Sequence, residues 1–420
     1  GPELPSDNVL AVHVATEVDE YFKNSKIMNE EAKMAVGRIA RLDKRELETG
    51  VKLGKGGFST VWEISKVSLF KAKSGGNASM KFSEVIKENY GRKNFGIVKV
   101  GDEDNRSDWK DTDLMNQEHD RKQIHKHHLR DGISRYAIKM LHSSYESDPQ
   151  QHFSGIIDLA VETRFLSVIR HPNILKMRAI SLSDPYKSNF FIILDKVYGT
   201  LDDKINEWFR EHRKNNGCIK QLMGGKKAQE KLFNERLLIM FDIASAVQHL
   251  HSLGILYRDL KPENLGFDIK GKIKLFDFGL AVELVPEKML ENGTYKVDPG
   301  GTRRYMPPEV VKNEPCNFSV DVYSFGILLW GVLALDSAFK FLSEERHTEL
   351  VVHQNLRPTI PTSWPSEIQS FLPACWHENM FERPNFDEIV DMFDELTVDF
   401  MTANKPMANN NSFSSVSYTY

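Results

Sequence analysis

The chain has 420 residues, of which 40% are hydrophobic and 27% charged, and its formal net charge is −4 at pH 7. This length predicts two lobes or domains, and the near-neutral charge gives no electrostatic basis for binding nucleic acid or a membrane. The three cysteines, Cys218, Cys316 and Cys375, lie far apart. Their spacing argues against a disulfide framework and a structural zinc site, and favours a cytoplasmic or nuclear protein that is not secreted.

The first part of the chain predicts helices. Apolar side chains between residues 6 and 46 recur at helical spacing, which predicts one or two helices packed outside the main domain. We expect this N-terminal extension to cover residues 1–50. The side chains that carry the pattern are Val14, Val18, Tyr21 and Phe22. Gly1-Pro2 without a methionine resembles a protease-cleavage scar, so we expect the native N-terminus to lie upstream.

Short strands are predicted from Val51 onward, and helices predominate after Leu201. A small β-rich lobe followed by a larger helical lobe is an α+β arrangement, with a ligand cleft expected between the lobes. The longest apolar run, residues 325–335, is about half of what a membrane span needs. We expect a main domain over 51–397, a polar insertion at 66–134, an extension at 211–232 and a disordered tail at 398–420.

The first chemical motif is the glycine-rich segment Leu53-Gly54-Lys55-Gly56-Gly57-Phe58-Ser59-Thr60-Val61. Glycines let the backbone N–H groups of a strand–turn–strand unit approach phosphate oxygens closely. Taken alone, the same residues also describe an ordinary glycine-rich hairpin. A strand rather than a helix follows, and no Gly-Lys-Ser/Thr closes the segment, so it is neither a Rossmann fingerprint nor a Walker A loop.

The second motif pairs a lysine with a glutamate. Lys139 ends the apolar strand at 135–139, where it points either to solvent or into a cleft. Glu162 lies on the next predicted helix, beside the apolar face, where an unpaired carboxylate would be costly. An ion pair between the two side chains would satisfy both and would orient the ammonium group toward phosphates.

Two polar loops complete the set. Tyr257-Arg258-Asp259-Leu260-Lys261-Pro262-Glu263-Asn264 combines a carboxylate that can accept a hydroxyl proton, an ammonium group and an amide oxygen that can bind Mg²⁺. Asp277-Phe278-Gly279 follows a short strand and supplies a second oxygen ligand for the metal. The spacing between Asn264 and Asp277 suits a hairpin that brings these two ligands together.

These four motifs, in this order, resemble those of the eukaryotic protein kinases, and the resemblance covers residues 50–397. Within it, the closing helices are similar to those of the tyrosine-kinase-like group, whose name refers to relatedness and not to tyrosine specificity. The segments that carry the later part of the resemblance are Gly301-Thr302-Arg303-Arg304-Tyr305-Met306, Pro307-Pro308-Glu309, Asp321-Val322-Tyr323-Ser324-Phe325-Gly326, Cys375-Trp376 and Glu382-Arg383-Pro384-Asn385-Phe386.

The resemblance implies a bilobal kinase fold, ATP and Mg²⁺ as cofactors, protein substrates, and transfer of the ATP γ-phosphate to Ser or Thr. It implies that Lys139, oriented by Glu162, holds the α- and β-phosphates, and that Asn264 and Asp277 bind Mg²⁺. Asp259 would accept the substrate proton and Lys261 would stabilise the phosphoryl oxygens. Glu309 would pair with Arg383. The expected nucleotide-binding residues are Leu53, Gly54, Gly56, Ser59, Val61, Ala137, Lys139, Leu194 as gatekeeper, Asp195, Val197 and Gly266.

Some positions depart from the family pattern. Ser59 stands where the third loop glycine is usual, Tyr257 replaces a histidine, and Pro307 replaces an alanine. We expect the Tyr257 ring to pack against Phe278. Gly266 stands where a bulky apolar residue forms the floor beneath adenine, which predicts a deeper pocket and weaker ATP binding; the alternative is that the backbone requires glycine there.

Two other functions remain open from the sequence. A pseudokinase scaffold would keep the fold without phosphoryl transfer, and a small-molecule kinase would lack use for the peptide shelf that residues 301–309 imply. We interpret two further groups as solvated surface rather than a metal site and a docking patch. The histidines are His119, His125, His127 and His128, and the basic residues are Arg210, Arg213, Lys214, Lys220, Lys226 and Lys227.

One hypothesis concerns regulation, and another concerns the insertion. A phosphate on Thr294 or Tyr295 could pair with Arg258 and order the loop between 277 and 309, or that loop could order unaided. The insertion at 66–134 is expected to be a mobile surface excursion with one small ordered piece.

Overall fold

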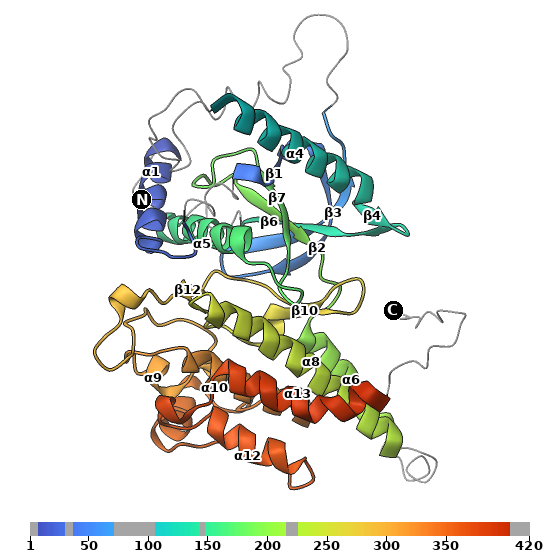
Figure 1. Cartoon of the computed structure of the whole chain (residues 1–420), viewed down its shortest axis with the longest axis vertical. Helices are drawn as coiled ribbons and strands as arrows, with labels where there is room; N and C mark the ends of the chain where they lie inside the picture. The colour runs from blue at the N-terminus through green and yellow to red at the C-terminus, as the bar shows by residue number, and fades with distance from the viewer. Residues whose placement is uncertain (1–6, 30–36, 71–105, 143–147, 216–225, 404–420) are drawn as a thin grey trace, which may run out of the picture.

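The computed structural model describes residues 7–29, 37–70, 106–142, 148–215 and 226–403, which form two lobes (Figure 1). The upper lobe in this view contains a sheet with helices packed on it, and the lower lobe is almost entirely helical. This is the bilobal α+β arrangement predicted from the sequence. Among the described residues, no helix is both long and apolar enough to cross a membrane.

The larger sheet has six strands in the order β1-β7-β8-β6-β3-β2. β1 pairs parallel with β7, and every other neighbouring pair is antiparallel. The strands are β1 (Ala40–Leu42), β2 (Leu47–Lys55), β3 (Ser59–Val67), β6 (Tyr136–Leu141), β7 (Met177–Ser181) and β8 (Phe191–Asp195). β3 and β6 are neighbours although the long insertion separates them in sequence, so Val61 lies opposite Lys139.

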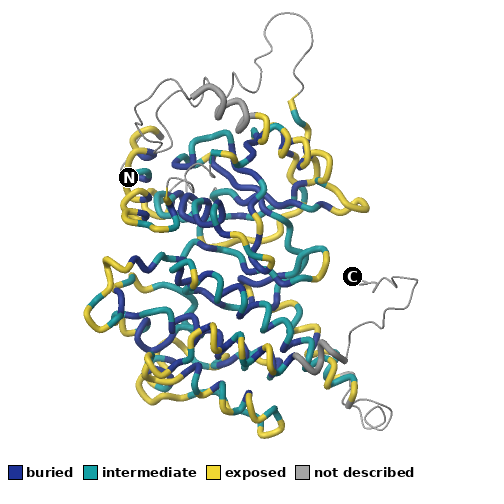
Figure 2. The backbone as a smooth tube through the Cα atoms, in the orientation of Figure 1, coloured by how far each residue is buried: buried dark blue, intermediate teal, exposed yellow. Residues whose placement is uncertain are grey.

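The two faces of this sheet belong to different cores. On β8, Phe191 and Ile193 join the cluster under helix α4 (Arg106–His127), whereas Ile192 and Leu194 join the main core with helix α5 (Pro149–Val168). This alternation follows from the two-residue period of a strand covered on both sides. Figure 2 shows buried residues in the middle of the sheet and along the inner faces of the helices, and most residues of β2 are exposed.

The N-terminal segment corrects one prediction. Helix α1 (Asp7–Tyr21) forms as expected, with Val14 and Val18 fully buried. However, α1 packs on α5 and shares the main core, and Ala40–Leu42 is a strand of the sheet rather than part of a helix. The expectation of helices lying outside the main domain is therefore wrong for this part of the chain, because the apolar face of α1 needs α5 to cover it.

The insertion also contains more structure than expected. The C-terminal part of α4 packs on the sheet, where Arg121 is 2% exposed and lies 2.7 Å from Glu46, which is 1% exposed. Ile124 joins the apolar cluster of the same face. A short hairpin, β4 (Leu129–Arg130) and β5 (Ile133–Ser134), leads from α4 into β6. Residues 71–105 of the insertion lie outside the described residues.

The helical lobe is organised around α10, whose residues are nearly all buried. The apolar run at 325–335 belongs to this core helix. Helix α13 continues to Ala403, so the start of the expected disordered tail is helical, and residues 404–420 lie outside the description. The extension expected at 211–232 is helical at both ends and undescribed at 216–225. The helices are α6 (Leu201–Asn215), α8 (Lys226–Ser252), α9 (Pro308–Val311), α10 (Ser319–Ala334), α11 (Glu344–His347), α12 (Ser366–Cys375) and α13 (Phe386–Ala403).

Several shorter elements connect these helices. Two small antiparallel ladders lie at the top of the lobe, β9 (Ile255–Leu256) with β12 (Val282–Glu283) and β10 (Leu265–Phe267) with β11 (Ile273–Leu275). The single-turn elements are η1 (Lys44–Glu46), η4 (Pro262–Asn264), η5 (Pro286–Lys288), η6 (Arg303–Tyr305), η7 (Thr348–His353) and η8 (Met380–Glu382). The histidines of α4 at 119, 125 and 127 and the described arginines of α6 at 210 and 213 are exposed, as interpreted from the sequence.

Candidate active site

Lys139 lies on β6 between two carboxylates. Its Nζ atom is 2.6 Å from Glu162 Oε2 on α5 and 3.0 Å from Asp277 Oδ1. Burial alone would lower the pKa of the Lys139 ammonium, but the charges of Asp277 and Glu162 outweigh that effect and hold the pKa above its ordinary value. The same ammonium holds the pKa of Asp277 below its ordinary value. The predicted Lys139–Glu162 pair is therefore present, and Lys139 is charged at neutral pH.

Asp259 is the centre of a second polar group. Its carboxylate accepts hydrogen bonds from Lys261 Nζ at 2.7 Å, Thr302 Oγ1 at 2.7 Å and Asn264 Nδ2 at 2.8 Å. Lys261 Nζ also donates to Thr302 Oγ1 at 2.8 Å. These contacts fix the Asp259 side chain, which is 8% exposed, between the loop and the segment that begins at Gly301. The structure thus brings together the residues that the sequence assigned to catalysis.

The loop that carries Asp259 has a strained backbone, which hydrogen bonds to Asp321 stabilise. Arg258 has a φ of 75°, which is unfavourable for a residue with a side chain. Asp321 on α10 is fully buried, and its carboxylate accepts from the N–H groups of Tyr257 at 2.8 Å and Arg258 at 2.7 Å. His251 Nε2 donates to the same carboxylate at 2.9 Å. Asp321 therefore satisfies two buried donors that the strained turn leaves without a backbone partner.

Asn264 and Asp277 lie at adjacent ends of one hairpin, as the spacing predicted. Leu265 pairs with Leu275, and the N–H of Phe276 donates to the Asn264 carbonyl at 3.1 Å. The side-chain amide of Asn264 donates twice to Asp259, which leaves the amide oxygen as its remaining coordinating atom. Together with the Asp277 carboxylate, this gives the hard oxygen donors that Mg²⁺ prefers.

The aromatic pair beside this hairpin confirms another expectation. The rings of Tyr257 and Phe278 meet edge to face with centroids 5.4 Å apart, and both side chains are buried. The Tyr257 hydroxyl donates to the Phe276 carbonyl at 2.6 Å. Tyr257 therefore links the two loops through its ring and its hydroxyl, in the place of the usual histidine.

The glycine-rich segment forms the β2–β3 hairpin of the upper lobe. Gly54 pairs with Val61, and the Gly56 N–H donates to the Ser59 carbonyl at 2.8 Å. The Phe58 carbonyl accepts from the N–H of His142, which ties the turn to the end of β6. The segment is therefore a hairpin, and its role in binding phosphate stays a prediction.

The chain between the lobes begins at Leu194, opposite Ala137, and both side chains are buried. The Asp195 carboxylate accepts from Arg178 at 2.7 Å and 2.8 Å, so this side chain is held by β7. The Asp195 N–H donates to the Lys176 carbonyl at 3.0 Å, so neither this N–H nor the carboxylate is free for adenine, and the backbone role expected for Asp195 stays a prediction.

The deeper pocket expected at Gly266 is absent. A Cβ atom at this position would lie 2.2 Å from Val197 Cγ1 and 2.8 Å from the Gly199 carbonyl oxygen. The Val197 side chain therefore occupies the space that a bulky floor residue would fill, and the Thr200–Gly266 bridge keeps the two segments close. A side chain at position 266 would overlap both neighbours, so the close approach of the two backbone segments requires glycine here.

Comparison with known proteins agrees with this geometry. The model of the protein kinase domain matches residues 123–393, more than half of the chain. The chain belongs to the protein kinase family. The matched span begins inside the insertion, so the glycine-rich hairpin of this kinase precedes it in sequence while sharing the sheet with β6.

Individual relatives are also kinases by name. The chain is 29% identical to a probable serine/threonine-protein kinase of Dictyostelium discoideum over 56% of its length and 23% of that protein. It is 28% identical to the serine/threonine/tyrosine-protein kinase HT1 of Arabidopsis thaliana over 56% of its length and 53% of that protein. It is 33% identical to the serine/threonine-protein kinase STY17 of Arabidopsis thaliana over 38% of its length and 27% of that protein. The matched part of the chain thus covers about a quarter to a half of the length of these relatives.

The segment from Asp277 to Glu309, here called the activation segment, contains the two residues for which a regulatory phosphate was considered. Thr294 is 1% exposed and donates to Asn292 Oδ1 at 2.7 Å, and Tyr295 is 8% exposed and pairs with Cys316. The guanidinium of Arg258 donates to backbone carbonyls, including that of Leu280 at 3.2 Å. The phosphate hypothesis for these two residues stays a prediction; both residues are buried, and Arg258 has partners within the activation segment.

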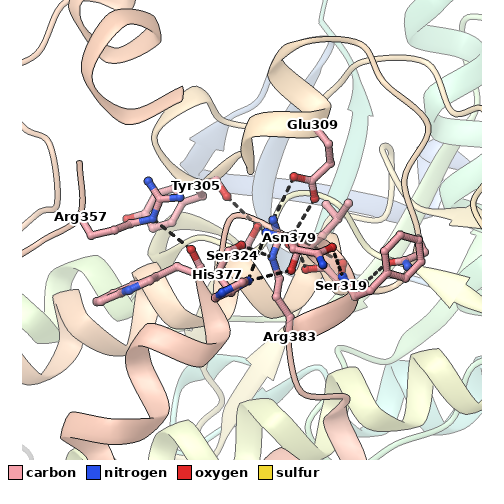
Figure 3. Close-up of polar contacts among 12 residues, drawn as sticks. Tyr305, Glu309, Ser319, Ser324, Arg357, His377, Asn379 and Arg383 are labelled. Atoms are coloured by element: carbon pink, nitrogen blue, oxygen red, sulfur yellow. Dashed lines mark hydrogen bonds and ion pairs between the residues drawn. The ribbon is translucent and has the colours of Figure 1, made fainter. Parts of the chain in front are cut away.

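The end of the segment is anchored in the helical lobe (Figure 3). Arg383 donates to both oxygens of Glu309, at 2.6 Å and 3.0 Å, and to the carbonyls of His377 at 2.9 Å and Ser319 at 3.2 Å. Its guanidinium also lies over the Tyr323 ring. This pair was implied by the resemblance, and the structure contains it.

Two contributors to the site were not assigned from the sequence. Asp158 lies one turn before Glu162 on α5, and burial, with added repulsion from Asp277 and Glu162, raises its pKa to about 7. Its carboxylate lies near Gly279. Asp321 was noted only as part of a helix motif, although an acidic residue at the start of a long apolar helix is a signal that a buried partner exists.

Proposed function

We propose that this kinase transfers the γ-phosphate of ATP to serine or threonine hydroxyls of protein substrates. The observation that carries the proposal is the intact group around Asp259, in which Lys261 and Thr302 both contact the carboxylate. The relatives named as serine/threonine kinases support it. The pseudokinase alternative has no support among those relatives.

The protein's own residues would act by positioning and by charge. Asp259 is held by three donors, so its carboxylate is oriented before a substrate arrives and can accept the proton of the attacking hydroxyl. Lys261 lies beside it and can stabilise charge on the transferring group. Lys139 is held between Glu162 and Asp277 and can bind the α- and β-phosphates. A loose phosphoryl-transfer transition state requires little more than this.

The oxygen donors of Asn264 and Asp277 fit a divalent cation. We propose Mg²⁺, which when bound would neutralise phosphate charge and would share Asp277 with Lys139. The nucleotide would lie under the β2–β3 hairpin, against Val61, Ala137 and Leu194, with backbone contacts from Asp195 and Val197.

We further propose that the kinase belongs to the tyrosine-kinase-like group and acts in the cytoplasm or nucleus. The Cys375-Trp376 and Arg383-Pro384 motifs support the group. The described cysteines, Cys316 and Cys375, are free and buried, which agrees with a reducing compartment.

The decisive experiment is a peptide-array phosphorylation assay with ATP and Mg²⁺, using wild type and Asp259→Asn. We expect wild type to label Ser- and Thr-containing peptides. We expect Asp259→Asn to lose transfer while retaining ATP binding, because the mutant keeps the size of the side chain and loses the proton acceptor. Asp336→Asn, which alters a half-exposed carboxylate paired with Lys340, is the matched control and should retain activity. A wild type that labels no peptide, or an Asp259→Asn variant with most of the wild-type turnover, would refute the proposal.

A second measurement addresses the metal ligands. Asp277→Asn should reduce the dependence of ATP affinity on Mg²⁺, because it removes the charge that the cation would neutralise. Equal ATP affinity of wild type with and without Mg²⁺ would contradict the assignment.

A further inference from the structure

The N-terminal segment contacts the helix that carries Glu162. Phe22, directly after α1, meets Phe165 edge to face with ring centroids 5.3 Å apart, and Phe165 lies one turn beyond Glu162 on α5. Arg164 on the same helix pairs with Asp19 of α1 at 2.6 Å. Figure 1 shows α1 beside α5 at the left of the upper lobe. These contacts restrain α5 on the side remote from the sheet.

The turn after α1 contacts a second element of the site. The Tyr21 hydroxyl donates to the carbonyl of Ala281, four residues beyond Asp277. Glu283 accepts from the backbone N–H groups of Lys26 at 2.7 Å and Ile27 at 3.3 Å, and the Ser25 hydroxyl bonds to it as well. Glu283 belongs to β12, which pairs with β9 immediately before the Asp259 loop.

One short segment therefore joins the two elements whose carboxylates hold Lys139. α5 supplies Glu162, and the start of the activation segment follows Asp277. The buried face of α1 is enough to cover the apolar side of α5. The polar contacts with Ala281 and Glu283 bury no part of α5; instead, they fix the position of the activation segment relative to α5.

We propose that residues 7–28 are a built-in activating element that positions Glu162 and Asp277 on Lys139, with Tyr21, Phe22 and Glu283 as positioning residues. The inference rests on the proposed kinase activity. It goes beyond that activity because residues 7–28 lie outside the span that matches the kinase family. Loss of these contacts should release α5 and the activation segment from their present arrangement while leaving the helical lobe folded.

The test uses the full chain with three single variants and one control. Tyr21→Phe removes only the hydroxyl, Glu283→Ala removes the acceptor of the turn, and Phe22→Ala removes the ring that meets Phe165. The control, Val12→Ala, changes a side chain of α1 that is 63% exposed. We expect kcat to fall roughly three- to tenfold in each positioning variant, the population shift expected for losing one such contact. KM for the peptide and the activity of the control should stay unchanged.

Hydrogen exchange separates this role from simple destabilisation and from failure of the proposed function. The positioning variants should accelerate exchange in α5 and in residues 277–283 while α10 and α13 remain as protected as in wild type. This readout needs no phosphoryl transfer, so an inactive wild type would refute the kinase proposal without deciding this one. Unchanged kcat and unchanged α5 exchange in all three variants, or accelerated exchange throughout both lobes, would overturn the inference.

Discussion

Replacing Arg383 with alanine tests whether the buried ion pair of the helical lobe stabilises this kinase as its geometry indicates. The substitution removes both hydrogen bonds to Glu309 and those to the carbonyls of His377 and Ser319. Glu309 is 4% exposed, so its carboxylate would remain buried without its partner. The free-energy change is therefore dominated by the uncompensated charge and not by the lost attraction alone.

Removing one partner of a buried pair typically costs about 3–5 kcal/mol. Domains are stable by about 5–15 kcal/mol, so the variant should lose a large share of its free energy of unfolding. For a unit of this size, the expected fall in melting temperature is roughly 10 °C. Removing Glu309 as well should cost less than the sum of the two single changes, because no buried charge is then left behind.

The chain supplies a control with the same geometry and different burial. Arg346 Nη1 lies 2.6 Å from Glu349 Oε2, the same separation as in the Arg383–Glu309 pair, but these side chains are 58% and 51% exposed. Arg346→Ala should cost less than about 1 kcal/mol. Thermal unfolding followed by circular dichroism measures both variants. If Arg383→Ala melts within a degree or two of Arg346→Ala, burial does not determine the strength of these pairs and the reasoning is wrong.

Three further predictions concern single positions. Gly266→Ala should weaken ATP binding at least several-fold and lower the melting temperature, because the Cβ atom of alanine would overlap the Val197 side chain. Unchanged ATP affinity by calorimetry would contradict the steric argument. Asp158→Asn should stabilise the kinase more at pH 8 than at pH 5. The pKa of Asp158 is raised to about 7 in the folded protein, so the folded protein loses stability as the pH rises from about 4 through 7, and asparagine does not share this loss. Equal melting-temperature differences between variant and wild type at both pH values would exclude this prediction. Arg121→Ala should lower the melting temperature by roughly 10 °C, because it leaves the buried Glu46 carboxylate without its cationic partner, whereas Lys122→Ala on the exposed face of α4 should have little effect. Similar melting temperatures for the two variants would show that α4 is not part of the sheet lobe.

The catalytic loops were predictable because their chemistry lies in short, ordered stretches of sequence. The residues from Tyr257 to Asn264 and the Asp277 motif need only one hairpin to meet, and the loop between them has a length that such a hairpin allows. The Lys139–Glu162 pair was predictable for a related reason, since a carboxylate beside an apolar helical face requires a buried partner.

Other features depended on contacts between distant segments. Gly266 could not be interpreted from its neighbours in sequence, because the Val197 side chain that fills the space belongs to another strand connection. Strand β1 carries three residues, too few for a periodic pattern, and its pairing with β7 is set by tertiary packing. The burial of Arg121 against Glu46 was hidden because the surrounding segment is mostly polar and highly charged.

The three residues of β1 also bear on how well this kinase stays dispersed in solution. β1 hydrogen-bonds along β7, and Arg121 of α4 donates to the carbonyl of Arg41 in β1. β1 therefore covers the edge of β7, and α4 covers part of β1. An uncapped edge strand offers unpaired N–H and C=O groups to other molecules. A fragment trimmed to begin at Asp43 would lack β1 but keep β2 and β3, and would expose β7 in this way. Such a fragment should associate edge to edge, and sedimentation of the trimmed and full-length proteins at equal concentration would reveal the difference.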